Sequence, residues 1–535
     1  MNKLFYGDNL SIVERLPKYS VDMIYLDPPF NSAQNYNLLY KTMTGKPVPE
    51  QAEAFCDTWD MDAEKENLAR TMPMLMREYG VADYYVEFWR LWIQALRQTQ
   101  PHLLAYLIYM VQRLLHMKSI LKPTGSIYLH CDPTASHYIK VMMDGIFGHQ
   151  NFQNEIIWKR TNSRSTSGRW PRVHDVILFY SNGSSFRFRP QKVKGDITKI
   201  PHTLITGLDG KKYQTYELTA PGRTKHGDSG RPWRGFDPDA MGRHWANTSV
   251  TMDAWDADGL IHWPKNGGFP RRRARDPFVP DAREVTVPDV WTDIDRINQS
   301  AKERMGYPTQ KPIALLKRII EASTEPGDVV FDPFCGCGTT IYAAHEAGRN
   351  WIGCDVAILA VRLIEQQLQQ RYGLVEGEHF VVDGVPNSVD SARRLWERHK
   401  IHFEHWAVEA VGGFPTKASG DLGIDGRIYF EMQKTLGVMV LSVKGGHIRP
   451  TDIRDLIGVL AVEPDAKLAG FISLEESTKA MKSTAAAAGT WEYAGIQYPR
   501  VQLLTVREIV EDKKTFHMPT KVGTKNVTGQ GVLAI

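Results

Sequence analysis

The segment Phe331-Asp332-Pro333-Phe334-Cys335-Gly336-Cys337-Gly338-Thr339-Thr340 decides the fold of this chain. It joins an apolar stretch, residues 329–331, that predicts a buried strand to a stretch, residues 339–347, that predicts a helix. Glycines let such a turn approach a ligand closely, and the N-terminus of the following helix favours negative charge. A second predicted strand, residues 351–354, ends at Asp355, where an acid can accept the hydroxyls of a nucleotide ribose. Together these features predict a nucleotide-type cofactor site on an α/β sheet.

The loop has the spacing Phe-x-Gly-x-Gly after Asp-Pro, and not Gly-x-Gly-x-x-Gly. This spacing favours S-adenosylmethionine over the alternative, a dinucleotide. Cys335 and Cys337 lack the second pair of ligands that a structural zinc site needs, so we interpret them as small residues of a tight loop.

Strands and helices alternate through the rest of the first block of the chain. Strands are expected at residues 4–6, 21–26 and 126–130, and one long helical region from about Tyr84 to Leu121. This alternation predicts a parallel sheet covered by helices on both faces. Residues 181–300 are irregular and rich in Gly, Pro, Trp and Arg, and α/β order resumes at Pro312.

The tetrapeptide Asp27-Pro28-Pro29-Phe30 follows the strand at residues 21–26, where α/β folds place ligands. Its two prolines remove two N–H donors, so the segment offers acceptors: the Asp27 carboxylate and the Pro28 carbonyl. An exocyclic amino group has two N–H donors that suit these acceptors, and Phe30 offers a face on which an extruded base can stack. The tetrapeptide therefore predicts methylation of an amino group on a base.

Asp-Pro-Pro-Phe followed by Phe-x-Gly-x-Gly resembles the beta class of DNA amino-methyltransferases, over residues 1–180 and about 290–375. The resemblance implies a circularly permuted, Rossmann-like fold that binds S-adenosylmethionine, in which residues 4–6 supply the strand missing after Asp355. It implies catalytic roles for Asp27, Pro28, Pro29 and Phe30. The implied cofactor-binding residues are Asp8, Thr309, Lys311, Asp332, Phe334, Gly336, Gly338, Thr339 and Asp355. Asp at position 27 resembles adenine-N6 enzymes more than cytosine-N4 enzymes, which remain the alternative.

The region between the two matching blocks holds Arg271, Arg272 and Arg273, where the family keeps its target-recognition region. The arginines could contact DNA phosphates or form a solvated basic loop.

The C-terminal region resembles the Mrr-type restriction endonuclease domain over about residues 400–510. That resemblance implies an α/β endonuclease-like fold with Asp425 and Lys444 in its metal site, and leaves Mg²⁺ open as a second cofactor. Ser442 stands where the family has Glu or Gln, so metal affinity should fall unless Glu409, Asp421 or Glu431 replaces the ligand. A DNA-binding remnant of a nuclease is favoured over an active nuclease.

The expected domain boundaries follow from these matches. They are a methyltransferase domain at 1–180 (catalytic part) and 301–390 (cofactor-binding part), a target-recognition region at 181–300, an endonuclease-type domain at 395–515 and a tail at 516–535.

Composition agrees with a nucleic-acid enzyme: 14 Trp and a net charge of +4 in 535 residues suit base stacking and phosphate binding. Five cysteines without a pairing pattern and no apolar run of bilayer length predict a cytoplasmic protein without a membrane association. The leading hypothesis is a site-specific adenine-N6 methyltransferase acting on double-stranded DNA in restriction-modification or defence, with no metal required for methylation and homodimerisation left open. The alternatives are a bifunctional methyltransferase-endonuclease and a DNA-sensing protein.

Overall fold

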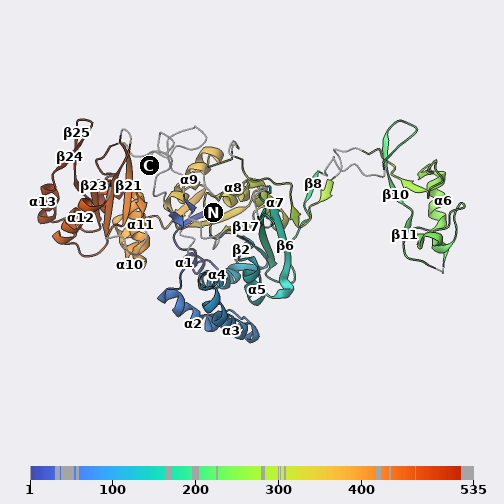
Figure 1. Ribbon diagram of the computed structural model, residues 1–535, viewed down its shortest axis with the longest axis horizontal. Helices are drawn as coiled ribbons and strands as arrows, with labels where there is room; N and C mark the ends of the chain where they lie inside the picture. The colour runs from blue at the N-terminus through green and yellow to red at the C-terminus, as the bar shows by residue number, and fades with distance from the viewer. Residues whose placement is uncertain are drawn as a thin grey trace. The chain divides into compact units, whose positions relative to one another are not determined.

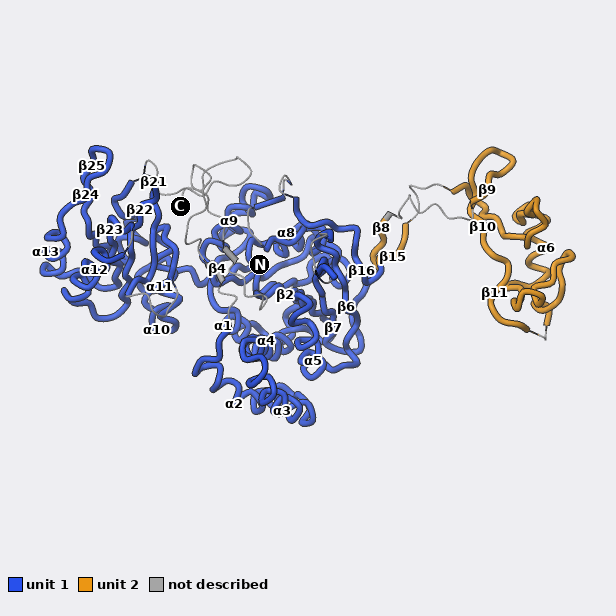
Figure 2. Tube along the Cα trace, viewed as in Figure 1, with its two compact units in different colours: residues 1–189, 288–535 blue, residues 190–287 orange. Residues whose placement is uncertain are grey.

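The structure is a computed structural model, which describes residues 2–29, 36–37, 53–55, 59–163, 168, 170–194, 204–224, 227–278, 284–298, 301, 303–305, 309–416, 423–432, 435–463 and 465–519. The chain divides into two compact units: residues 1–189 with 288–535, and residues 190–287 (Figure 2). No helix among the described residues is long and apolar enough to cross a membrane.

The core of the larger unit is a sheet to which the described residues contribute nine strands. In spatial order the strands are β16 (Val290–Trp291), β6 (Phe152–Lys159), β7 (His174–Ser181), β5 (Leu121–Cys131), β2 (Val21–Leu26), β17 (Val329–Asp332), β18 (Asn350–Asp355), β1 (Asn2–Tyr6) and β19 (Phe380–Asp383). The central strands are buried along nearly their whole length, as expected of a sheet covered on both faces.

The sheet is mixed, so the expectation of a wholly parallel sheet was wrong at one strand. β7 runs antiparallel to both β5 and β6, whereas the other neighbouring pairs are parallel. Residues 160–173, which join β6 to β7, contain no described helix, and a connection without a crossover helix favours antiparallel pairing. β1 pairs with β18, as the sequence predicted, while β19 pairs with β1 at the sheet edge.

Helices pack on both faces of this sheet (Figure 1). They are α1 (Asn9–Val13), α4 (Pro101–Ile120), α5 (Ser136–Phe147), α7 (Ile313–Ser323), α8 (Thr339–Glu346) and α9 (Ile358–Tyr372). Two further helices, α2 (Ala63–Glu78) and α3 (Asp83–Thr99), pack against α4 on its side away from the sheet (Figure 1). In Figure 1, α4 and α5 lie on one side of the sheet and α8 and α9 on the other. The chain also forms a short hairpin, β3 (Tyr36–Asn37) with β4 (Glu53–Phe55).

The long helical region expected from Tyr84 to Leu121 is two helices. α3 ends at Thr99, and Pro101 begins α4 because proline fits the first helical turn but cannot continue a helix. α4 is apolar around most of its circumference and is largely buried, so it forms the middle of this helical layer.

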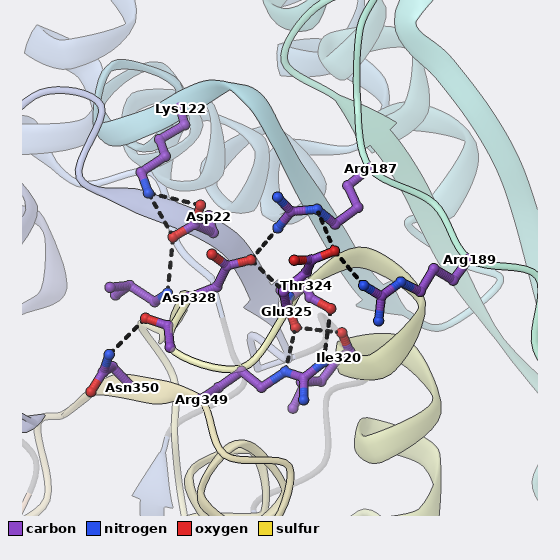
Figure 3. Close-up of polar contacts among 12 residues, drawn as sticks. Asp22, Lys122, Arg187, Arg189, Ile320, Thr324, Glu325, Asp328, Arg349 and Asn350 are labelled. Atoms are coloured by element: carbon purple, nitrogen blue, oxygen red, sulfur yellow. Dashed lines mark hydrogen bonds and ion pairs between the residues drawn. The ribbon is translucent and has the colours of Figure 1, made fainter.

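Charged side chains tie together the edge of the sheet at which β2 and β17 begin (Figure 3). Asp22 accepts hydrogen bonds from Lys122 at 2.8 Å and from the backbone N–H of Val329 at 2.9 Å. Arg187 pairs with Asp328 on the same edge. These contacts fix the register of β2 against β17 at the end opposite to Asp27.

In the smaller unit, residues 190–287, the described residues form short strands, one α-helix and two short 3-10 helices, with a small core around Trp233, Trp245 and Met252. Its elements are β8 (Lys192–Lys194), β9 (Leu204–Thr206), β10 (Lys212–Glu217), β11 (Thr219–Pro221), β12 (Arg243–Trp245), α6 (Ser249–Ala257), β13 (Ile261–His262), β14 (Arg271–Arg273) and β15 (Glu284–Thr286).

A second sheet lies in the C-terminal part of the larger unit, in the order β20-β21-β22-β23-β26. Its elements and the adjoining ones are α10 (Val389–Arg398), α11 (Lys400–Ala410), β20 (Phe414–Pro415), β21 (Gly426–Met432), β22 (Thr435–Lys444), α12 (Pro450–Val462), β23 (Ala466–Ser473), α13 (Lys479–Ala487), β24 (Thr490–Tyr493), β25 (Ile496–Pro499), β26 (Val501–Thr505) and α14 (Val506–Val510). The sheet has its own apolar core, which includes Val440, Ile453 and Phe471.

Candidate active site

The predicted catalytic and cofactor segments meet because β2 and β17 are paired neighbours. Met23 lies opposite Val330 and Ile24 opposite Phe331, in parallel register. Both strands therefore end at the same edge, where β2 leads into Asp27 and β17 ends at Asp332. Phe30 lies outside the described residues, as do Tyr307 and Pro308 of the segment before Lys311.

The loop after β17 is a tight turn that requires its glycines. Gly336 has φ 51° and Gly338 has φ 85°, which disfavour any residue with a side chain. A Cβ on Gly338 would also stand 2.7 Å from a side-chain carbon of Ile364. Gly338 caps the N-terminus of α8, and Thr339 is the first residue of that helix.

Two buried acids flank this loop. Asp355, at the end of β18, accepts the backbone N–H of Gly336 at 2.8 Å and that of Ala357 at 2.9 Å. Asp332 accepts the N–H of Phe334 at 3.0 Å. Burial raises the pKa of Asp355 to about 6 and that of Asp332 to about 7, since an ion loses its hydration there.

Asp8 reaches the same edge from β1, because the N–H of Gly7 donates to the carbonyl of Asp355 at 2.9 Å. Its carboxylate caps α1 by accepting the N–H of Leu10, and it pairs with Arg113 at 2.6 Å. Arg113 also donates to the side chain of Asn9 at 2.7 Å. Its guanidinium lies 3.4 Å from the centre of the Tyr109 ring. This buried cation compensates one of the acids that gather around the loop.

Asp27 is joined to Lys311 from the far part of the chain. The Lys311 ammonium lies 2.5 Å from Asp27 Oδ2, and the two side chains are only 11% and 17% exposed. Thr309 lies two residues before this lysine, in a turn. The structure thus joins Lys311, a predicted cofactor-binding residue, by an ion pair to Asp27, the predicted catalytic carboxylate.

A buried chain of hydrogen bonds runs beneath the tetrapeptide. The hydroxyl of Tyr25 lies 2.9 Å from His130 Nδ1, and His130 Nε2 lies 3.2 Å from Asp175. Arg160 pairs with the other oxygen of Asp175 at 3.2 Å. Burial by itself would raise the pKa of Asp175, but the hydrogen bond to His130 together with the charges of His130, Lys311 and Arg160 lowers that pKa overall. The chain links β2, β5, β7 and the end of β6 just below Asp27.

Comparison with known proteins agrees with this arrangement. Residues 21–366 match the N6/N4 DNA methylase family. This chain is a member of the DNA methylase family. The match spans both the tetrapeptide at the end of β2 and the glycine loop after β17.

Two curated relatives of this DNA methylase are a type II methyltransferase and a subunit of a type III restriction-modification enzyme. The type II methyltransferase M.EcaI of Enterobacter cloacae is 34% identical over 261 residues, which are 49% of this chain and 56% of that protein. The Mod subunit of the type III enzyme StyLTI of Salmonella typhimurium is 27% identical over 389 residues, 66% of this chain and 52% of that protein. The chain thus spans about half the length of the curated relatives it matches.

A crystal structure of TTHA0409, a putative DNA modification methylase from Thermus thermophilus complexed with S-adenosyl-L-methionine, covers 71% of this DNA methylase. It aligns over 98% of its own chain at 14% identity, with a TM-score of 0.33.

The three arginines of the smaller unit of this DNA methylase are engaged within that unit. Arg271 donates to the hydroxyl of Thr215 at 3.0 Å. Arg272 stacks over the ring of Trp255 at 4.4 Å, and Arg273 over that of Tyr213 at 4.3 Å. All three are half-buried in β14, so they are not the freely solvated loop that was the alternative. Their contact with phosphate stays a prediction.

The C-terminal sheet brings the three predicted nuclease-type residues together. Asp425 Oδ2 accepts the N–H of Val443 at 2.6 Å, next to Ser442 on the same strand. Lys444 ends the same strand, β22. The described residues contain no group of three or more His, Cys, Asp or Glu side chains able to hold a metal ion.

Among the described residues, the acid that approaches these residues is Glu404 and not Glu409, the one expected replacement whose side chain the structure describes. Burial, followed by the charge of Asp425, raises the pKa of Glu404 on α11, which places Glu404 near the cluster. Glu409, on the same helix, points instead to the methylase sheet and accepts the N–H of Ile358 at 3.2 Å. Asp421 and the side chain of Glu431 lie outside what the structure describes.

Sequence reasoning missed Arg113 and the role of Glu409. Arg113 could have been recognised in the sequence, because it is a single charge within the most apolar part of α4. A buried charge needs a partner, so a buried ion pair could have been predicted there. Glu409 could not have been recognised, since its partner is a backbone N–H some fifty residues away.

Proposed function

We propose that this chain is a site-specific DNA methyltransferase, which transfers a methyl group from S-adenosylmethionine to the N6 amino group of adenine in double-stranded DNA. The restriction-modification systems of its relatives supply the proposed setting. The observation that carries the proposal is the pairing of β2 with β17, since it puts Asp27 beside the glycine loop although some 300 residues separate them. Two reactants held side by side in this way react far faster than free ones.

Asp27 and Pro28 would act on the amino group of the base. The Asp27 carboxylate and the Pro28 carbonyl each accept one N–H, which orients the nitrogen lone pair toward the methyl group. The negative charge of Asp27 also stabilises the positive charge that grows on that nitrogen. The bound S-adenosylmethionine supplies an electrophilic methyl group. Pro29 keeps the segment free of competing donors, and Phe30 would stack on the extruded base.

The residues around the loop fit this cofactor in their chemistry. Asp355, a carboxylate at the end of β18 beside the loop, suits the ribose hydroxyls, and Asp8 suits the adenine amino group. Gly336 and Gly338 allow close approach of the backbone, and Phe334 and Thr339 flank them. Asp332 holds the loop through the N–H of Phe334. Thr309 and Lys311 would close the methionine end.

We propose further that the fold is circularly permuted. In space, β17, β18 and β1 follow one another outward from the centre of the sheet. In the chain, β1 and β2 come first and β17 and β18 follow the smaller unit. A circular permutation of the chain would give this combination of spatial order and chain order. Residues 181–300 are proposed to recognise the target, with Arg271, Arg272 and Arg273 near phosphate.

Adenine is proposed as the target base because position 27 is Asp and not Ser. The family includes enzymes for cytosine N4 as well as adenine N6. Nucleoside mass spectrometry of DNA from cells that express the protein decides between them: N6-methyladenine is the expected product. N4-methylcytosine as the sole product would refute the base assignment and leave the reaction class standing.

The catalytic assignment is tested by Asp27→Ala. Methyl transfer to DNA should be lost, because one of the two acceptors and the stabilising charge are removed. Binding of S-adenosylmethionine, measured by calorimetry, should persist. Methylation at the wild-type rate in this variant would refute the proposed role of Asp27.

For the C-terminal sheet we propose a DNA-binding remnant of a nuclease, in preference to an active nuclease. Ser442 offers one short, neutral oxygen where a charged or amide ligand would be needed. Lys444 remains available to meet a phosphate.

A further inference from the structure

Lys311 pairs with Asp27, the carboxylate proposed to accept a hydrogen bond from the amino group that is to be methylated. Its ammonium is 2.5 Å from Asp27 Oδ2, and both side chains are largely buried. An amino group of a base and the lysine ammonium are both donors, so they compete for the same carboxylate oxygen. The pair with Lys311 therefore uses one of the acceptors that Asp27 would offer to the base.

The charge of Lys311 also reaches the cofactor side of the site. It acts on the thiol of Cys337, inside the glycine loop, and on the carboxylate of Asp175 beneath the tetrapeptide. The ammonium thus lies between the end of β2 and the loop after β17.

The backbone that carries Lys311 is fixed on both sides, whereas its side chain is long and flexible. Gln310 accepts the N–H of Met305 at 2.8 Å and donates to the carbonyl of Glu303 at 2.6 Å. Pro312 caps α7. The lysine side chain has four methylene groups that can rotate, so its ammonium can move by the length of several bonds while the backbone stays in place.

We propose that Lys311 exchanges one anion for another as the substrates bind. Before the cofactor binds, Lys311 pairs with Asp27, and afterwards it pairs with the carboxylate of the methionine part of S-adenosylmethionine. The exchange releases Asp27 for the base, so the base is accepted only when the methyl donor is present. This inference rests on the proposed function, and it adds an order of binding to it.

The proposed exchange predicts how substitutions of Asp27 and Lys311 change the Kd for S-adenosylmethionine. Part of the cofactor's binding free energy is used to break the Asp27–Lys311 pair, so removing the charge of Asp27 should tighten binding. For a partly buried pair of this kind the gain is about five-fold in Kd. Lys311→Met should weaken binding by about ten-fold, because a charge-assisted contact to the cofactor carboxylate is lost.

The test is calorimetric titration of the full chain with S-adenosylmethionine. The variants are Asp27→Asn, Lys311→Met and the double variant. Asp27→Asn should tighten binding on its own and have no effect in the Lys311→Met background, because the two changes act through one pair. 5′-Methylthioadenosine, which lacks the methionine carboxylate, is the matched ligand, and its affinity should be the same in the wild type and in Asp27→Asn.

Asp22→Asn is the matched control variant. Asp22 pairs with Lys122 at the opposite end of the same strand, so its loss should leave cofactor affinity unchanged. Binding that weakens or stays equal in Asp27→Asn would overturn the exchange, since it would mean that Lys311 bridges both anions or never leaves Asp27. Failure of the wild type to bind S-adenosylmethionine at all would instead refute the proposed function.

Discussion

Glu409 should make the stability of this protein depend on pH, and Glu409→Gln should remove that dependence. The carboxyl group is buried where α11 meets α9, and burial raises its pKa from 4.5 to about 8. At neutral pH the folded protein therefore keeps a proton that the unfolded chain releases. Glutamine has nearly the same shape and retains an oxygen that can accept the N–H of Ile358, but it cannot ionise.

The size and sign of the effect follow from the pKa shift. Because the folded pKa is raised, the favourable contribution of Glu409 is complete below pH 4.5 and is lost as the pH rises toward 8. Between pH 4.5 and pH 7 the wild type should lose about 3 kcal/mol relative to Glu409→Gln, and about 5 kcal/mol by pH 9. In a domain of this size each kcal/mol corresponds to roughly 2 °C in Tm.

Scanning calorimetry of both proteins between pH 5 and pH 9 is the assay. The difference in Tm should grow steadily in favour of Glu409→Gln, by about 6 °C at pH 7. Asp332 and Asp355 also titrate in this range, but they are present in both proteins and largely cancel in the difference. Glu397→Gln, at an exposed position on α10, is the control and should show no such trend. A Tm difference that is constant from pH 5 to pH 9 would refute the reasoning.

Three further changes test other contacts. Arg113→Met should lower the affinity for S-adenosylmethionine by about ten-fold, measured by calorimetry, because a nearby carboxylate loses its buried cation; unchanged affinity would contradict a link between that pair and the cofactor. Gly338→Ala should lower the free energy of unfolding by about 2 kcal/mol in urea, because its Cβ would stand 2.7 Å from Ile364. Gly348→Ala has a similar φ but open space around the new Cβ, so it should lower that free energy by less, and equal losses would argue against the clash. The wild type should not cleave unmethylated, site-bearing plasmid with Mg²⁺ or Mn²⁺, and Lys444→Ala should weaken DNA binding; cleavage that disappears in Lys444→Ala would show an active nuclease.

The sequence by itself determined the local parts of the site. A turn between β17 and α8 that needs glycines, and acids at the ends of β18 and β2, are properties of short segments, so they could be recognised from residue types and spacing. The place of β1 beside β18 was also predicted from the sequence, because the sheet needed a strand that no later segment close to Asp355 supplied. The break between α3 and α4 could have been predicted as well, since Pro101 marks it.

Only the tertiary structure decided which charges meet. Lys311 forms an ion pair with Asp27, and Arg113 forms one with Asp8. Glu409 accepts a backbone N–H in the first turn of α9, and each of these contacts joins segments more than fifty residues apart. Sequence indicates that a charge is present but not which partner will share its burial, because that partner is set by how strands and helices pack. The antiparallel course of β7 has the same origin: strand direction depends on the path of the connecting chain through space, and not on the apolar pattern of the strand itself.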